Sequence, residues 1–398
     1  MNHASRSFDG PRLMRREELI AMIRLSHLCF GGPQEIENEE DILAGYDPPQ
    51  RGGTYVITHE GKPVSQIGVF HDQIKMYDGK ISTGSIGGVC THPDYRGQGL
   101  AGRLLVHCTN QMVREGARLM LISGEGLLYT RAGNVLQGKY MYVSIKPGQG
   151  NPWRSTPTDL VLRKATPADA ALCSQLYQAE PVHFVRKLSD FAPAVQDSLR
   201  NNYISAEPWI IERAGRAMAY LFLGIPWGET PDAGIRHVGE YAGSRITLAD
   251  AMPLLMNASH LKELIWQVPW QDADLTRLLG DSGYHGKTTY LYGHTLRIVN
   301  FPGFMADLRP LLQARVDAKL LRGLRFEQSG PPIGGTGNDR YVIRRGHDRL
   351  ELDGAAMTLL VMGNANPQAE PVHAPGALGE IISALFPLPS LLPGLNYH

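Results

Sequence analysis

Residues Val89 to Leu105 read VCTHPDYRGQGLAGRLL. A strand-like run ends at Cys90, a polar turn follows, and a glycine-rich loop then opens a helix. Glycines let the backbone approach a ligand closely, and the free N–H groups at the N-terminus of a helix attract a phosphate or pyrophosphate. The stretch therefore predicts a phosphate-binding loop between a strand and a helix. The alternative is an ordinary helix start whose glycines serve packing.

Two known phosphate-binding motifs match this stretch of sequence. The first is GxGxxG at Gly97–Gly102, the dinucleotide fingerprint, with Glu125 near the spacing of about 20 residues expected for a ribose ligand. In a dinucleotide-binding fold the first glycine follows its strand directly, whereas here six residues, Thr91–Arg96, intervene. A nicotinamide-dependent oxidoreductase is therefore the weaker interpretation. The second motif is Arg96-x-x-Gly99-x-Ala101.

Upstream of the loop, the sequence predicts a helix and then strands joined by tight turns. Apolar residues recur at helical spacing between Glu17 and Leu28. Strand-like runs follow, and Asp78-Gly79 between two of them is a hairpin signal. Leu119–Ile122 is fully apolar, which is typical of a strand buried on both faces. The segments expected are strands at 54–57, 64–76 and 80–90, a helix at 99–115, strand 119–122, a short helix at 127–131 and a strand at 140–145.

A linker rich in proline and glycine, at 147–152, separates this unit from the next. Residues 160–169 then run from a strand into a helix with Pro167 in its first turn, and strands at 209–212 and 217–223 repeat the plan of the first unit. A third unit is expected from near His294. Its segments are a strand at 296–299, a helix at 305–315, strands at 324–328, 341–345, 350–353 and 357–362, and a helix at 378–385. The sequence thus predicts three domains, at 1–150, 151–293 and 294–398.

Composition excludes several classes of protein. Lys plus Arg and Asp plus Glu both number 39, and this zero balance removes the usual electrostatic argument for nucleic acid as a partner. The start lacks the apolar core of a signal peptide, and three prolines break the uncharged stretch 381–398, so no membrane span is expected. No HExxH and no metal-type cysteine spacing occurs, so no metal site is expected. The cysteines are scattered along the chain, which indicates reduced, unpaired thiols and a cytoplasmic protein. The four cysteines are Cys29, Cys90, Cys108 and Cys173.

The Arg96-x-x-Gly99-x-Ala101 motif, with its lead-in His92-Pro93-Asp94-Tyr95, resembles the acetyl-coenzyme A (acetyl-CoA) loop of GNAT acetyltransferases. The layout of the whole chain is similar to that of the Eis-type (enhanced intracellular survival) family. The resemblance implies an α/β (α+β) fold: tandem GNAT folds with mixed, mostly antiparallel sheets flanked by helices, and a C-terminal unit like a sterol carrier protein (SCP). The second GNAT-like unit lacks the motif and is expected to bind no cofactor.

The resemblance also implies where acetyl-CoA binds. The backbone of Val89, Cys90 and Thr91 would pair with the pantetheine arm, and Ser123 would face it across a gap between two strands. The loop residues expected to bind the cofactor are Arg96, Gly97, Gln98, Gly99, Leu100 and Ala101. Cys90 reads as a packed strand residue rather than a nucleophile, because no family signature places a histidine beside it.

The stretch Ser123–Gly133 is similar to the family's segment that carries its general-acid tyrosine, and this resemblance implies the same role for Tyr129. A neutral O–H near the sulfur can supply a proton as the thiolate leaves. The family's C-terminal carboxylate takes the proton of the amine, which implies this role for His398. The alternatives are a packed aromatic at Tyr129 and a frayed terminus at His398. The acidic run Glu35–Asp41 is either a solvated face or a charge that attracts a cationic substrate.

These observations predict an acetyl-CoA-dependent N-acetyltransferase that acts on a primary amine by direct attack on the thioester. By resemblance, the small-molecule acceptor would be an aminoglycoside or a lysine-type amine, and the chain would form a homo-oligomer, a hexamer in that family. A non-catalytic acyl-CoA-binding protein on a GNAT scaffold remains the alternative from another class.

Overall fold

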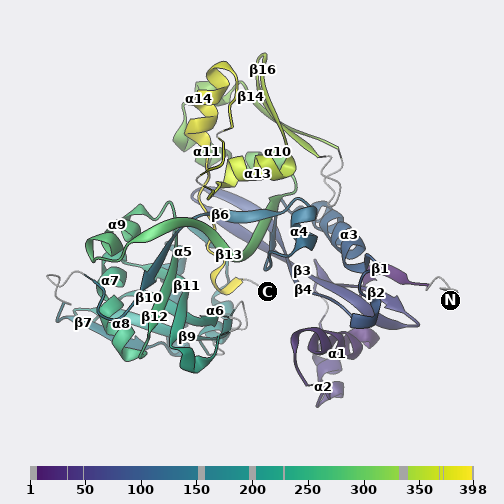
Figure 1. Cartoon of the computed structure of the whole chain (residues 1–398), viewed down its shortest axis with the longest axis horizontal. Helices are drawn as coiled ribbons and strands as arrows, with labels where there is room; N and C mark the ends of the chain where they lie inside the picture. The colour runs from purple at the N-terminus through teal and green to yellow at the C-terminus, as the bar shows by residue number, and fades with distance from the viewer. Residues whose placement is uncertain are drawn as a thin grey trace.

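The hairpins expected before residue 90 form one end of a long sheet in the computed structural model (Figure 1). The structure describes residues 7–33, 35–47, 49–150, 157–196, 203–226, 229–330, 339–366, 368–370 and 372–396. The first strands are β1 (Asp9–Leu13), β2 (Gly53–His59), β3 (Lys62–Met76), β4 (Gly79–Thr91), β5 (Leu119–Ile122) and β6 (Val135–Ile145). Their helices are η1 (Arg16–Glu18), α1 (Leu19–Phe30), α2 (Glu39–Gly45), η2 (Pro93–Tyr95), α3 (Leu100–Arg114) and α4 (Leu127–Arg131).

Strand β5 is buried on both faces, as its unbroken apolar run predicts. Met120 and Ile122 belong to the hydrophobic cluster under α3, whereas Leu119 and Leu121 face the cluster formed with the C-terminal helices. β4 and β5 are parallel, and α3 makes the connection between them. The loop that precedes α3 therefore lies at the carboxyl end of β4.

The middle of the chain repeats this plan. Three antiparallel strands, β9 to β11, are followed by β12, which pairs in parallel with β11 after two short helices. The strands here are β7 (Leu160–Lys164), β8 (Val182–Phe184), β9 (Tyr203–Arg213), β10 (Arg216–Pro226), β11 (Ile235–Gly243), β12 (Glu263–Pro269) and β13 (Gly286–Ile298). The helices are η3 (Pro167–Asp169), α5 (Ala170–Gln178), α6 (Leu188–Gln196), η4 (Pro231–Ala233), α7 (Arg245–Asp250), α8 (Met252–Ala258) and α9 (Ala273–Asp281).

One continuous sheet joins the two halves. Within the described residues its order is β1-β2-β3-β4-β5-β13-β6-β12-β11-β10-β9-β7, and β8 pairs with β3. β13 pairs with both β5 and β6, so the expected domain limit at 293–294 falls inside this strand. The mixed, mostly antiparallel sheet flanked by helices confirms the expected fold class. The division into three domains stays a prediction.

The C-terminal part packs on the first half of the sheet, where its helices share a cluster with Ile74, Ile81 and Leu121. A separate sheet of three antiparallel strands covers these helices. The elements are α10 (Phe301–Asp307), α11 (Arg309–Arg315), α12 (Ala318–Leu321), β14 (Leu324–Ser329), β15 (Arg340–Arg345), β16 (Asp348–Asp353), α13 (Gly354–Met362), α14 (Gly376–Leu385) and η5 (Gly394–Asn396).

Three expectations about elements are wrong. Residues 357–362 form helix α13 rather than a strand, because Asp353 caps it by accepting the N–H of Ala356 at 2.8 Å. The helix expected at 305–315 is two helices, α10 and α11, and Pro310 lies in the first turn of the second. The turn before β4 is Tyr77-Asp78, one residue earlier than expected. Gly79 is in the strand, where an added Cβ would lie 2.8 Å from Leu308.

No helix in the described part of the chain is long and apolar enough to cross a bilayer.

Candidate functional site

The parallel pair β4–β5 opens before β4 ends. Their register runs from Thr83↔Leu119 to Ile86↔Ile122, and β4 then continues to Thr91, paired with β3 alone among the described strands. A bulge interrupts the β3–β4 ladder here, and Gly88 has φ +58°. The backbone beyond Ile86 therefore presents an edge on the β5 side. An extended ligand arm can pair with such an edge.

The loop at the start of α3 is built to hold an anion. Gly97 and Gly99 have φ +77° and +74°, a left-handed conformation that costs glycine little. Within the described chain, the N–H groups of residues 97–102 donate no hydrogen bond. They lie at the positive end of α3, a helix of 15 residues. Free N–H groups in this position can hold a phosphate or pyrophosphate.

The glycines of this loop do not serve packing. A Cβ placed on Gly97, Gly99 or Gly102 would meet no atom within 4 Å. Residues 96–99 are exposed, whereas Leu100 is buried in the cluster under α3, and Ala101 is half-buried. Arg96 holds the loop against the end of β4 by donating from Nε to the carbonyl of Thr91 at 3.2 Å. The conformation thus favours a ligand over the packing alternative.

Tyr129 lies on α4, just beyond the end of β5. Its ring packs against the same cluster as Val89 and Leu100, and covers Gly124, where an added Cβ would lie 2.6 Å from the ring. Burial raises the pKa of Tyr129, so the hydroxyl is protonated at neutral pH. Among the described residues, that hydroxyl has no hydrogen-bond partner. Tyr129 is a packed aromatic whose O–H is available to a ligand.

Ser123 and Cys90 lie at the ends of two neighbouring strands. Ser123 follows β5 directly and is half-buried. Cys90 is buried near the end of β4, and burial, followed by the neighbouring Cys29 thiol, raises its pKa well above the ordinary value. A thiol that stays protonated is a poor nucleophile, so the packing interpretation of Cys90 is favoured. All four cysteines are free.

The acidic run is a solvated surface. Glu39 and Glu40 begin α2, and Glu39 forms an ion pair with Arg24. Most of the carboxylates in 35–41 are exposed, while Ile42 and Leu43 pack under the helix. His398 lies outside the described residues. The described tail reaches Asn396, whose side chain accepts a hydrogen bond from Arg186.

Arg186 also lines a cavity of about 850 Å³ that the sequence motifs do not predict. The cavity lies beside β3, between the start of β2, where Gly53 pairs with Val69, and the end of β8, where Phe184 pairs with Ile74. Its charged lining includes Asp72 and Asp190 together with Arg51, Arg186 and Lys187. The cavity exists because β8, from the second half of the chain, pairs with β3 of the first half. No local sequence pattern predicts the pairing of β8 with β3.

Part of the chain matches a known domain family. Residues 11–133 match the profile of the acetyltransferase (GNAT) domain. Domains of this family use acetyl-CoA or another acyl-CoA as co-substrate. No curated protein matches the sequence significantly. The match covers η1 to α4, together with the loop at 96–102.

Solved structures share the fold over nearly the whole chain. A conserved Enterococcus faecalis protein, described as a probable N-acyltransferase, has a TM-score of 0.66 and 15% identity, over 99% of this chain and all of that one. A GCN5-related N-acetyltransferase from Kribbella flavida has a TM-score of 0.61 and 14% identity, over 97% of each chain. Eis1 from Mycobacterium abscessus has a TM-score of 0.57 and 12% identity, over 90% of each chain. This chain therefore has the fold of these proteins. The antiparallel strands before the loop disagree with a dinucleotide-binding fold.

Proposed function

We propose that this protein is an acetyl-CoA-dependent N-acetyltransferase that acts on a primary amine. The observation that carries the proposal is the row of N–H groups at residues 97–102, which lies beside the open edge of β4. This row suits the pyrophosphate of coenzyme A, and the edge suits the amide groups of its pantetheine arm. The GNAT match over residues 11–133 supports the same assignment.

The reaction proceeds by direct transfer. The free amine attacks the thioester carbonyl, the C–S bond breaks, and the thiolate takes the proton of the Tyr129 hydroxyl. The attacking nitrogen loses a proton to the carboxylate of His398, directly or through water. A backbone N–H near Val89 polarises the carbonyl, and most of the acceleration comes from holding both substrates in register. The bulge at Gly88 supports this role, because it turns the backbone at that point of β4.

The acceptor proposed is an aminoglycoside-like or lysine-type amine in the cavity beside β3. Asp72 and Asp190 offer carboxylates for an ammonium group beside the cations Arg51, Arg186 and Lys187. Asn396 brings the described tail to the cavity wall at Arg186. The proposal includes the Eis-type arrangement with an SCP-like third unit, a homo-oligomer and a cytoplasmic location. The free cysteines support the location. Sedimentation velocity tests the oligomer.

Calorimetric titration with acetyl-CoA is the first test. We expect a Kd for acetyl-CoA in the micromolar range, which corresponds to a binding free energy of about −8 kcal/mol. We expect no binding of NADH. A thiol-release assay with kanamycin and Nα-acetyl-lysine then tests turnover. If the titration shows no heat of binding at millimolar acetyl-CoA, the proposal is contradicted. Binding without turnover of either amine favours the non-catalytic acyl-CoA-binding alternative.

A further inference from the structure

Helix α4, which carries Tyr129, is only five residues long. A single turn of helix is not stable by itself, because nucleation fixes several residues for one hydrogen bond. Its position must therefore come from contacts at its ends. Asn134 provides one of them: its backbone N–H and its side-chain amide both donate to the carbonyl of Tyr129, at 3.1 and 3.0 Å.

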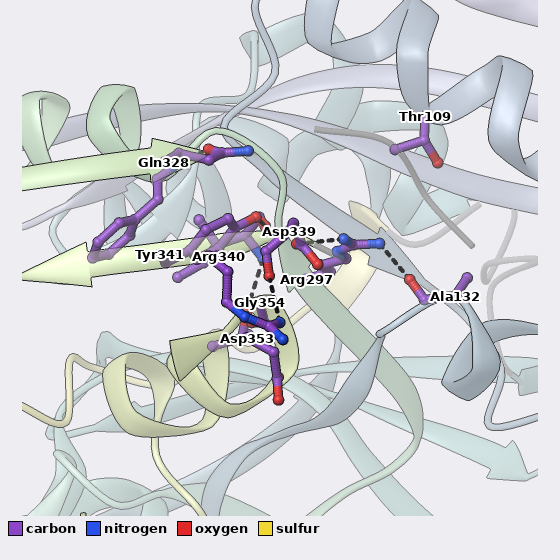
Figure 2. Close-up of polar contacts among 12 residues, drawn as sticks. Thr109, Ala132, Arg297, Gln328, Asp339, Arg340, Tyr341, Asp353 and Gly354 are labelled. Carbon is purple, nitrogen blue, oxygen red and sulfur yellow. Dashed lines mark hydrogen bonds and ion pairs between the residues drawn. The ribbon is translucent and has the colours of Figure 1, made fainter. Parts of the chain in front are cut away.

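The second contact comes from far along the chain. Arg297 on β13 donates from Nη1 to the carbonyl of Ala132, the C-cap of α4. Its Nη2 donates to Oδ2 of Asp339 at 2.6 Å, and the side chains of this pair are 2% and 3% exposed. Figure 2 shows the guanidinium between these two partners, with α4 on one side and the C-terminal strands on the other. One buried side chain thus joins α4 to the C-terminal unit.

Two glycines leave room for this pair. An added Cβ on Gly133, which has φ +81°, would lie 3.4 Å from Cζ of Arg297. An added Cβ on Gly354 would lie 2.1 Å from Oδ2 of Asp339. The residue after Arg297 is held by the same unit, since the hydroxyl of Tyr341 donates to the carbonyl of Ile298 at 2.5 Å. The guanidinium is therefore held at Nη1 and Nη2, as Figure 2 shows, while its buried Nε has no hydrogen-bond partner among the described residues.

We infer that Arg297 and Asp339 are positioning residues for Tyr129. They fix the C-terminal end of α4, so the tyrosine hydroxyl points to the sulfur of the donor thioester. The C-terminal unit, which supplies Asp339, thereby acts on the reaction without touching either substrate. This inference rests on the proposed function for its kinetic consequence, but the restraint on α4 can be measured without turnover.

Two conservative variants break the restraint. Arg297→Lys keeps the charge but cannot bridge Ala132 and Asp339 at the same time. Asp339→Asn keeps the shape and removes one charge. We expect hydrogen exchange of the backbone amides at 127–134 to rise about tenfold or more in each variant, while exchange within α3 is unchanged. The control is Asp307→Asn, which breaks the ion pair of Arg118 and Asp307, 3.0 Å apart, between the same two parts of the chain.

The kinetic test uses acetyl-CoA with the amine that turns over faster in the thiol-release assay. We expect kcat to fall about 10- to 100-fold in Arg297→Lys and Asp339→Asn, because a shift of about 1 Å in a catalytic group has an effect of this size. The Kd of acetyl-CoA, measured by calorimetry, should not change, since the loop at 96–102 keeps its contacts. In a Tyr129→Phe background, Arg297→Lys should lower kcat by less than about twofold, because both changes remove the same proton transfer.

Three results would overturn the inference: unchanged exchange at 127–134, an equal loss of kcat in Asp307→Asn, or additive losses in the double variant. If the wild-type protein turns over neither amine while α4 still loosens in both variants, the restraint on α4 stands and the proposed function fails. Unfolding of Arg297→Lys would leave Asp339→Asn to decide, with its melting temperature as the check on folding.

Discussion

Tyr129 combines two properties that its position in the sequence does not reveal together. Its ring is packed between the cluster under α3 and the bare backbone of Gly124, while its hydroxyl has no partner in the described chain. Packing removes rotational freedom from the ring, so the hydroxyl is held in one direction. Burial raises its pKa and keeps the hydroxyl protonated at neutral pH.

The proposed role predicts a specific effect of Tyr129→Phe. The change removes one oxygen from a ring that packs through its carbon atoms, so stability should change by less than about 1 kcal/mol. We expect kcat to fall about 100-fold, the lower range for loss of a general acid, with the Kd of acetyl-CoA unchanged. Thiol-release kinetics and calorimetry measure the two quantities. An unchanged kcat would assign the proton to another group.

At the scale of elements, α3 and the strand before it together form the proposed donor site. The loop conformation depends on left-handed glycines at its N-terminus, and α3 also ends on one, Gly116, with φ +98°. Neither Gly99 nor Gly116 has an atom within 4 Å of the Cβ position. The two positions therefore carry the same kind of backbone strain when substituted, but only one faces the predicted phosphate.

This pair gives a matched test. Gly99→Ala and Gly116→Ala should each lower the free energy of unfolding by about 1 to 2 kcal/mol, the cost of placing alanine in the left-handed region. Only Gly99→Ala should also weaken acetyl-CoA binding, by about tenfold, because the change moves the backbone N–H groups of the loop at 97–102. Denaturant unfolding and calorimetry measure the two effects. Equal weakening of binding by both variants would show that the loop is not the donor site.

At the scale of the whole molecule, β13 joins the two halves of the sheet by pairing with β5 and β6. Several polar side chains of β13 are buried there. His294 lies there, with Nδ1 2.7 Å from the carbonyl of Tyr292. Burial lowers the pKa of His294 from the ordinary 6.5 to about 4. The folded protein thus keeps this imidazole neutral where the unfolded chain would bind a proton.

Stability should therefore depend on pH. Between pH 6.5 and 4 the unfolded state binds more protons at His294, so the free energy of unfolding should fall as the pH falls, by at most about 3 kcal/mol. Denaturant unfolding at pH 7 and pH 5 measures this loss. His294→Gln should reduce the difference between the two pH values, whereas His285→Gln at an exposed position should not. The same slope in all three proteins would contradict the assignment.

Local patterns determined a large share of this protein. The hairpins, α3, the buried strand β5 and the loop with its left-handed glycines follow from periodicity, turn residues and the RGQGLA motif, because each depends on neighbours in the sequence. The resemblance to GNAT acetyltransferases assigns Val89, Leu100 and Tyr129 to one site, and the structure packs all three on one cluster. Their roles in binding and catalysis stay predictions.

Only the tertiary structure decided the rest. The apolar run at 357–362 fits strand and helix equally, and its cap at Asp353 and its packing selected the helix. The continuous sheet, the cavity beside β3 and the bridge from Ala132 through Arg297 to Asp339 all join segments that are distant in sequence. Such contacts depend on which apolar faces and buried charges find partners in the folded chain. Local sequence patterns do not predict these contacts, because the energy of each contact depends on both of the segments that meet and not on either segment alone.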